Sequence, residues 1–265
     1  MLALDGALEP LTLDVSVDPA DPDGQDGWYV SPVTVTATST DDATIEFSVD
    51  GSEWVADEDG VLEVTADGSH TVEVRAVRGD ETTEVETISI DLDGTAPEVD
   101  VDGITDGATV GSSDVVDVAV DATDATSGVA EVVVTVDGDE VASGDAPHSL
   151  SLQAWDWSLG EHVLTVEAVD VAGNSVVTEV TFTIETSLDD LQAHLDRLAD
   201  QGELDDKDHR WMTRKVELAE RMDDRGNVDA YHDQLEALLG WAERLDSADA
   251  RDLLVRELEG LLDQS

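Results

Sequence analysis

The side chains of this sequence that could do chemistry are mostly carboxylates. Asp and Glu number 65, against 12 Lys and Arg, six His and no Cys. Hard cations such as Ca²⁺ take six to eight oxygen ligands of this kind. One acidic loop runs from Asp121 to Asp124 and another from Asp170 to Asn174. The end residues of the two loops, Asp121, Asp124, Asp170 and Asn174, are the candidate ligands of a Ca²⁺ ion. The alternative, which the composition favours, is that these acidic side chains are only solvated.

Other kinds of catalytic or metal chemistry find little support. With 65 acids almost any carboxylate pair arises by chance, so pairs do not predict acid–base catalysis. The sequence has no glycine-rich phosphate loop, zinc-binding His pair on one helix or nucleophile elbow. Without Cys it has no thiolate zinc site and no disulfide framework. We therefore expect a chain that is not itself an enzyme, although it could be the non-catalytic tail of one.

A pair of tryptophans offers a different function, because aromatic faces stack on sugar rings. Trp155 and Trp157 are two residues apart and face the same way if the segment is extended. Trp157 is expected to pack under the turn at Gly160, which leaves Trp155 as the candidate carbohydrate platform. Cell-surface or extracellular polysaccharide is then a partner to consider.

The net charge of −53 restricts the environment and the partners. Self-repulsion of this size must be screened, and the Debye length falls from about 8 Å at physiological salt to about 3 Å at 1 M salt. This composition indicates a halophile. Nucleic acid and anionic membranes are disfavoured partners because both are polyanions.

The chain shows no obvious means of export or anchoring. The first five residues contain no basic side chain, so they do not form a signal peptide, and no apolar run is long enough to span a bilayer. We nevertheless expect an extracellular or cell-surface location, with the chain a fragment of a longer polypeptide whose upstream domain is a possible partner.

The elements that must position these residues are repeated. The segment from Gly68 to Val77 returns 92 residues later, from Gly160 to Val169, with alternating apolar residues after a Gly-x-His turn. Asp50-Gly51 and Asp137-Gly138 are matching hairpin signals. His70 and His162 occupy the same turn in both copies, so we interpret them as structural.

Short strands separated by turns every 8 to 12 residues predict an all-β sandwich in each copy. A break at Asp93-Gly-Thr-Ala-Pro97 separates the copies, because Pro cannot donate to a strand ladder. We expect an N-terminal extension at 1–10 and sandwiches at 11–94 and 95–186. The expected strands are 11–17, 33–39, 45–49, 61–65, 68–77 and 84–92, then 98–101, 114–122, 129–136, 149–152, 160–169 and 175–184.

Composition and periodicity change after Thr186. Residues 1–186 hold 43 acids and two basic residues, whereas residues 187–265 hold 22 and ten. Leucines at helical spacing follow a capping Ser187, and three further amphipathic stretches follow to the end of the chain. We expect residues 187–265 to form a small four-helix bundle, so the fold class is all-β plus all-α.

Several segments resemble known families. Ser48-Val-Asp-Gly-Ser-Glu-Trp54, Thr95-Ala-Pro97 and Asp170-Val-Ala-Gly-Asn174 resemble the Ig-like repeats of bacterial and archaeal secreted and surface proteins. The stretch from Ala219 to Leu235 resembles a FIMAH-type helical module. The Ig-like resemblance implies that the two acidic loops share one end of the second sandwich, facing the acidic loop at 18–26 of the first.

The function expected from these features is spacing or presentation. Such a chain would hold an upstream domain off a surface or dock it there, as part of a secreted or surface protein of a halophile. The rival interpretation is a carbohydrate-binding accessory region of a polysaccharide-degrading extracellular enzyme.

Overall fold

The computed structural model describes residues 9–40 and 42–264. Most of the expected N-terminal extension at 1–10 lies outside these residues. The described residues divide into two compact units: the chain up to Val99 with Ala122–Val132 and Glu167–Val176, and Asp100–Asp121 with Val133–Val166 and everything from Val177 onward. The three domains expected at 11–94, 95–186 and 187–265 remain a prediction.

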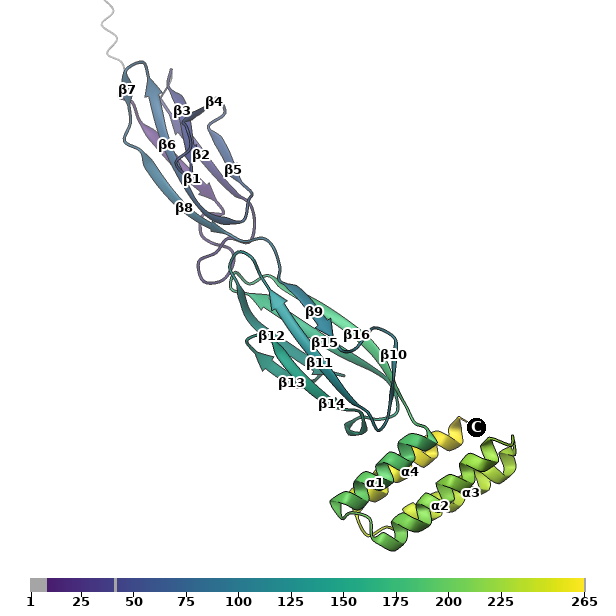
Figure 1. Ribbon diagram of the computed structural model, residues 1–265. Helices are drawn as coiled ribbons and strands as arrows, with labels where there is room; N and C mark the ends of the chain where they lie inside the picture. Colours follow the sequence, from purple (N-terminus) through teal and green to yellow (C-terminus); the bar gives the residue numbers. More distant parts are fainter. Residues whose placement is uncertain (1–8, 41, 265) are drawn as a thin grey trace, which may run out of the picture. The chain divides into compact units, whose positions relative to one another are not determined.

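The first repeat folds as a β-sandwich of antiparallel strands (Figure 1). One sheet has the order β1-β2-β5, and the other has the order β4-β3-β6-β7 with β8 also paired to β6. The pattern of two places Val33, Val35 and Ala37 of β2 in the core. The strands are β1 (Leu13–Asp18), β2 (Val33–Ser39), β3 (Thr44–Val49), β4 (Val55–Asp57), β5 (Val61–Val64), β6 (Gly68–Arg78), β7 (Glu81–Thr82) and β8 (Glu86–Leu92).

The second repeat is also a sandwich, with sheet orders β10-β16-β15-β12-β13 and β14-β11-β9. Its first sheet contains a parallel pair, in which Val110 of β10 lies opposite Ile184 of β16. The strands are β9 (Glu98–Asp102), β10 (Ala108–Gly111), β11 (Val115–Thr123), β12 (Val129–Val136), β13 (Asp139–Gly144), β14 (His148–Gln153), β15 (Gly160–Asp170) and β16 (Ser175–Glu185). The expected fold class is confirmed by these two sandwiches and the helices that follow them.

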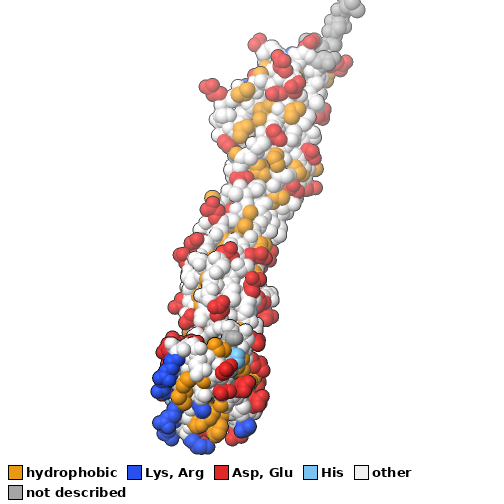
Figure 2. Space-filling view, turned by 90° about the vertical axis from the view of Figure 1, so that its right-hand side faces the viewer, with side chains coloured by type: hydrophobic (Ala, Val, Ile, Leu, Met, Phe, Trp, Pro, Cys, Tyr) orange, Lys and Arg blue, Asp and Glu red, His pale blue; other side chains and the backbone are white. Residues whose placement is uncertain are grey.

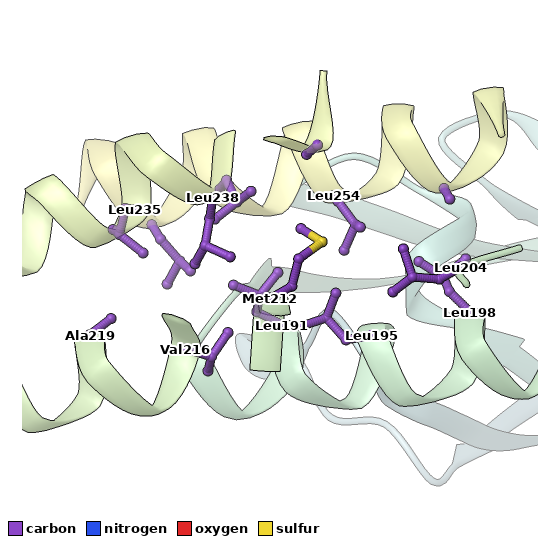
Figure 3. Packing of buried hydrophobic residues seen from close by; sticks show 14 of the residues in the cluster. Leu191, Leu195, Leu198, Leu204, Met212, Val216, Ala219, Leu235, Leu238 and Leu254 are labelled. Carbon is purple, nitrogen blue, oxygen red and sulfur yellow. The ribbon is translucent and has the colours of Figure 1, made fainter. Parts of the chain in front are cut away.

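Four helices complete the chain: α1 (Leu188–Gln201), α2 (Asp206–Asp223), α3 (Val228–Ala242) and α4 (Ala248–Asp263). Ser187 caps α1 as expected, accepting a hydrogen bond from the backbone N–H of Asp190, and Gly202 ends it with φ of 77°. The apolar stripes of the helices converge on one core, where Leu191, Leu195 and Met212 point into the same space (Figure 3). Among the described residues, no helix is long and apolar enough to cross a membrane.

Candidate functional site

The two repeated histidines brace the same hairpin in each sandwich. His70 contacts Asp50 through Nδ1 (2.9 Å) and the carbonyl of Ala66 through Nε2 (2.9 Å). His162 makes the matching contacts with Asp137 (2.6 Å) and the carbonyl of Ser158 (2.8 Å). The hydrogen bond with Asp50 is the main reason that the pKa of His70 is raised above 6.5. The structural interpretation of both histidines is confirmed.

An acidic cluster lies at the connection between the two sandwiches, within the first unit. One carboxylate oxygen from each of Asp93, Asp124 and Asp170 lies within 4.8 Å of the others. The side chains of Asp93 and Asp170 are buried, with 0% and 1% of their surface exposed. Such a group could hold a cation, since three carboxylates offer the oxygen ligands that Ca²⁺ prefers.

Backbone N–H groups hold these carboxylates in place. Asp124 accepts from the N–H groups of Thr126 (3.1 Å) and Gly128 (2.7 Å) through one oxygen. Asp93 accepts from the N–H of Ser127 (3.0 Å) through Oδ2. The loop from Asp124 to Gly128 is therefore shaped around the Asp124 carboxylate, as in an Asx turn, and it also binds the carboxylate of Asp93. The cluster is preorganised by the chain rather than by side-chain cations.

The remaining partners of the cluster come from the last loop of the second sandwich. Asp170 accepts from the N–H groups of Gly173 (2.6 Å) and Asn174 (2.8 Å). The Asn174 amide donates to Asp170 (2.9 Å) and to the backbone carbonyl of Asp93 (2.8 Å). We call the set Asp93, Asp124, Ser127, Asp170 and Asn174 the first joint. It ties Asp93, the first residue of the inter-repeat break, to two loops of the second sandwich.

The structure thus brings together Asp124, Asp170 and Asn174 of the four predicted ligands. The three-carboxylate group has Asp93 as its third member, and Asp121 is not in it. The acidic loop of the first sandwich also reaches this region, where the N–H of Gln25 donates to the carbonyl of Ala172 (2.7 Å). A Cβ at Gly24 would lie 2.6 Å from that carbonyl oxygen, so this approach requires glycine.

The predicted sugar platform, Trp155, lies where the helices meet the second sandwich, within the second unit. The Arg197 guanidinium lies 4.2 Å from the centre of its ring, and His194 approaches its ring edge-on. Arg256 donates to the carbonyls of Trp155 (3.1 Å) and Trp157 (2.6 Å). Trp155 also borders a hollow of about 390 Å³, together with Gln201, Glu203 and Asp249.

A buried chain of hydrogen bonds crosses this same contact, and sequence reasoning missed it. Ser112 lies 3.3 Å from His194 Nε2 and donates to Glu257 Oε2 at 2.5 Å. Arg256 donates to Glu257 Oε1 at 2.6 Å, and Arg197 lies 3.0 Å from His194 Nδ1. We call Ser112, His194, Arg197, Arg256 and Glu257 the second joint.

The direction of each hydrogen bond in the second joint follows from its end groups. Arg197 can only donate, so His194 Nδ1 accepts and its Nε2–H faces Ser112. Burial lowers the pKa of His194 below 6.5, although the charge of Glu257 acts in the opposite direction. The lowered pKa keeps the ring neutral. Ser112, His194 and Glu257 do not form a catalytic triad, because the Ser112 hydroxyl is directed to Glu257 and all three side chains are fully buried.

The tripeptide Arg78-Gly79-Asp80 consists of the last residue of β6 and the two-residue turn that leads to β7. Gly79 has φ of 63°, and the Arg78 side chain binds Glu81 (2.8 Å) and the carbonyl of Glu9 (3.0 Å). The arginine is therefore occupied within the sandwich.

Comparison with solved structures returns proteins with sandwich modules at low similarity. The fibronectin(III)-like modules of Clostridium thermocellum CbhA are 17% identical, with a TM-score of 0.33, 65% of this chain covered and 95% of that one. A bacterial ice-binding adhesin is 18% identical, with a TM-score of 0.30 and coverages of 68% and 67%. A two-domain fibronectin type III segment of chicken tenascin is 12% identical, with a TM-score of 0.31 and coverages of 64% and 97%.

Comparison with curated proteins finds no match. Two family models match separate parts of the chain: the bacterial Ig domain matches residues 97–166, and the FIMAH domain matches residues 188–263. Both are non-catalytic kinds of domain. The Ig-like resemblance of the second repeat and the FIMAH resemblance are confirmed, and the chain carries a bacterial Ig domain followed by a FIMAH domain.

Proposed function

We propose that this chain is a non-catalytic spacer or presentation region of a secreted or cell-surface protein. It holds a neighbouring domain of the same polypeptide at a distance from a surface, or docks it there. The observation that carries this proposal is that both joints are closed by buried, hydrogen-bonded polar side chains, including Asp93, Asp170 and Glu257. A flexible linker would leave such groups in water.

Distance measurements across each joint test this proposal. The chain has no Cys, so pairs of introduced cysteines carry spin labels without background. Thr87→Cys with Ser149→Cys spans the first joint, and Ser149→Cys with Glu236→Cys spans the second; all three positions are exposed. Stiff joints give narrow distance distributions for both pairs in pulsed electron resonance. A broad distribution for either pair contradicts the spacer role.

We further propose that the protein comes from a halophile, supported by its charge of −53. The 43 acids and two basic residues of 1–186 give that part a charge of −41, since 43 − 2 = 41. Its repulsion is screened at molar salt. The melting temperature should rise steeply between 0.1 M and 3 M potassium chloride, and a flat profile by circular dichroism would remove this part of the proposal.

Calcium binding at the first joint belongs to the same proposal. Three carboxylates within 4.8 Å, two of them buried, repel one another unless a cation neutralises them. An ion held by Asp93, Asp124 and Asp170 would replace that repulsion with coordination and stiffen the connection.

The second candidate function is a carbohydrate-binding accessory region of a polysaccharide-degrading enzyme. The observation that favours it is the hollow beside Trp155, which is also lined by the hydrogen-bonding side chains of Gln201 and Glu203. Binding on a glycan array that is lost in Trp155→Ala but kept in Trp54→Ala would support this function. Because Trp155 also contacts Arg197, an unchanged helical melting curve is needed to separate lost binding from lost structure.

A further inference from the structure

The exposed face of α2 is unusual in this acidic chain because it gathers cations. Lys207, Arg210 and Arg214 line a hollow of about 540 Å³ together with His209, Trp211, Thr213 and Glu217; we call it the α2 groove. In Figure 2 the Lys and Arg side chains lie along one edge of the helical region, and Asp and Glu lie along the other. The groove lies within the second unit, on one face of one helix.

The cations of the α2 groove are largely unused by the protein itself. Within the described part of the chain, no carboxylate pairs with the guanidinium of Arg210 or Arg214, and both side chains are exposed. Lys207 is 77% exposed, and its carboxylate neighbour Asp208 lies 4.0 Å away. With 65 acids in the chain, partners for these groups would be easy to supply. These three cations are therefore available to bind an anion from outside the chain.

An aromatic wall accompanies the cations. Trp211 stacks on Trp241 with ring centres 4.5 Å apart and an angle of 24° between the rings. Lys215 lies 5.6 Å from the centre of the Trp211 ring, and Lys207 lies 5.4 Å from that of Trp241. These contacts fix the half-buried Trp211 in the wall of the groove. A flat apolar wall beside forked cationic groups matches a sugar ring that carries an acid group.

We propose that the α2 groove binds a carboxylate-bearing polysaccharide, a polymer of uronic acid units. Arg210 and Arg214 are one helical turn apart, so their guanidinium groups can each clamp a carboxylate in a bidentate manner. The hollow falls in the range of about 300 to 1,000 Å³ that suits small ligand units. This site uses residues separate from Trp155 and does not depend on the stiffness of the joints.

Other anionic partners fit the groove less well. A lipid surface calls for exposed apolar anchors, and the exposed large hydrophobic side chains of the described residues are valines outside α2. A stable contact with a second copy of the chain needs about 800 Å² from each partner, more than one sugar-sized hollow supplies. Nucleic acid binders typically make about six to ten phosphate contacts, whereas three cations line this groove.

The test titrates the whole chain with polygalacturonate at decreasing concentrations of potassium chloride from 2 M, because salt screens both the repulsion from the sandwiches and the attraction of the groove for carboxylates. The double variant Arg210→Ala with Arg214→Ala should weaken binding at least tenfold. The matched control, Arg225→Ala with Arg244→Ala, removes the same charge from exposed arginines outside the groove and should change binding less than twofold. Neutral dextran should not bind. Circular dichroism should show equal helicity in all variants.

Several results would overturn the proposal. Equal weakening by both double variants would mean that binding follows net charge alone, and undetectable polygalacturonate binding at every salt concentration would mean that the groove has no such ligand. Duplex DNA or phosphatidylglycerol vesicles bound with the same dependence on Arg210 and Arg214 would identify another anion. Self-association in sedimentation experiments without polysaccharide, lost in the groove variant, would identify a second copy as the occupant.

Discussion

The two joints bury carboxylates in opposite ways. In the first joint, Asp93 and Asp170 are held by backbone N–H groups and an amide, and a third carboxylate, Asp124, lies nearby. In the second joint, Glu257 is equally buried but is paired with Arg256 at 2.6 Å. The second joint contains its own counter-charge, whereas the first has one only if a cation enters from solution.

This difference shows how a highly acidic chain can close its contacts. Ten of the 12 basic residues lie in 187–265, so the helical region can afford an internal ion pair. The only basic residues among the first 186 are Arg75 and Arg78, and they bind Glu46 and Glu81, respectively, inside the first sandwich. The connection between the sandwiches therefore depends on polar backbone groups and, in our proposal, on Ca²⁺.

The largest effect should come from removing the counter-charge of the second joint. Arg256→Ala leaves Glu257 buried without its cation, which typically costs about 3–5 kcal/mol. It also removes two hydrogen bonds to the carbonyls of Trp155 and Trp157. The helical melting transition, followed at 222 nm, should fall by many degrees.

The control for this effect is Arg221→Ala, which removes an exposed pair with Glu217 at 3.8 Å. Surface pairs of this kind contribute about 0–1 kcal/mol, so the melting transition should hardly move. Similar losses in the two variants would show that the buried pair has no special weight, and the contrast between the joints would disappear.

Calcium should have the next largest effect, and only on the first joint. At a concentration 100 times its dissociation constant, a ligand of the folded state adds about 2.7 kcal/mol. Calorimetry in 2 M potassium chloride should show saturable Ca²⁺ binding and a higher melting temperature, both lost in Asp124→Ala with Asp170→Ala. Monovalent salt at this level already screens non-specific attraction.

A second variant separates calcium binding from structural damage. Asp124→Asn keeps an oxygen for the N–H groups of Thr126 and Gly128 but removes one charge from the cluster. Without Ca²⁺ it should match or exceed the stability of the parent chain, and it should respond weakly to the ion. Glu84→Gln removes an exposed acid outside the joint and should leave the response unchanged. If the parent chain gives no heat and no thermal shift with Ca²⁺, the acids are merely solvated.

Most of the fold could be predicted because its strands and helices carry periodic apolar patterns. The sequence did not predict four strands, β4, β7, β10 and β13, because none of them shows a clear alternating pattern of buried residues. β4 and β7 are almost wholly exposed, so they bury no alternating face. β10 pairs in parallel with a strand far along the chain, and such a pairing leaves no hairpin signal nearby.

The candidate site was predicted only in part, because joints form from residues distant in sequence. Asp93 lies in the break between the repeats, and Asp is common in such turns. Its presence there therefore gave no reason to predict a partner distant in the sequence. His194 and Glu257 did carry a usable signal, since each sits on the apolar stripe of its helix, beside Leu195 and Leu258 respectively. What the sequence could not show is that Ser112, 82 residues before His194, reaches both of them.

The smallest predicted effect is on the pH dependence of stability, which should have opposite signs for His194 and His70. Unfolded His194 takes up a proton near its ordinary pKa of 6.5, whereas in the folded chain burial lowers its pKa. Its contribution to stability is complete above pH 6.5 and is lost as pH falls toward the lowered value. The groups facing it are Glu257, Arg197, Arg256 and Asp190, and protonation of Nδ1 would direct a hydrogen at the Arg197 guanidinium.

His70 should behave in the reverse manner because its hydrogen bond with Asp50 raises its pKa. Its contribution is complete below pH 6.5 and is lost as pH rises through the raised value. We therefore expect the plot of melting temperature against pH, between pH 5.5 and 8.5, to become flatter in both variants. His194→Gln should flatten its acid side and His70→Gln its alkaline side, by a few degrees in each case. His209→Gln, which removes a more exposed histidine that binds Asp196, is the control. If His194→Gln keeps the acid-side slope of the parent chain, the second joint does not depend on a neutral His194, and the hydrogen-bond directions assigned to it are wrong.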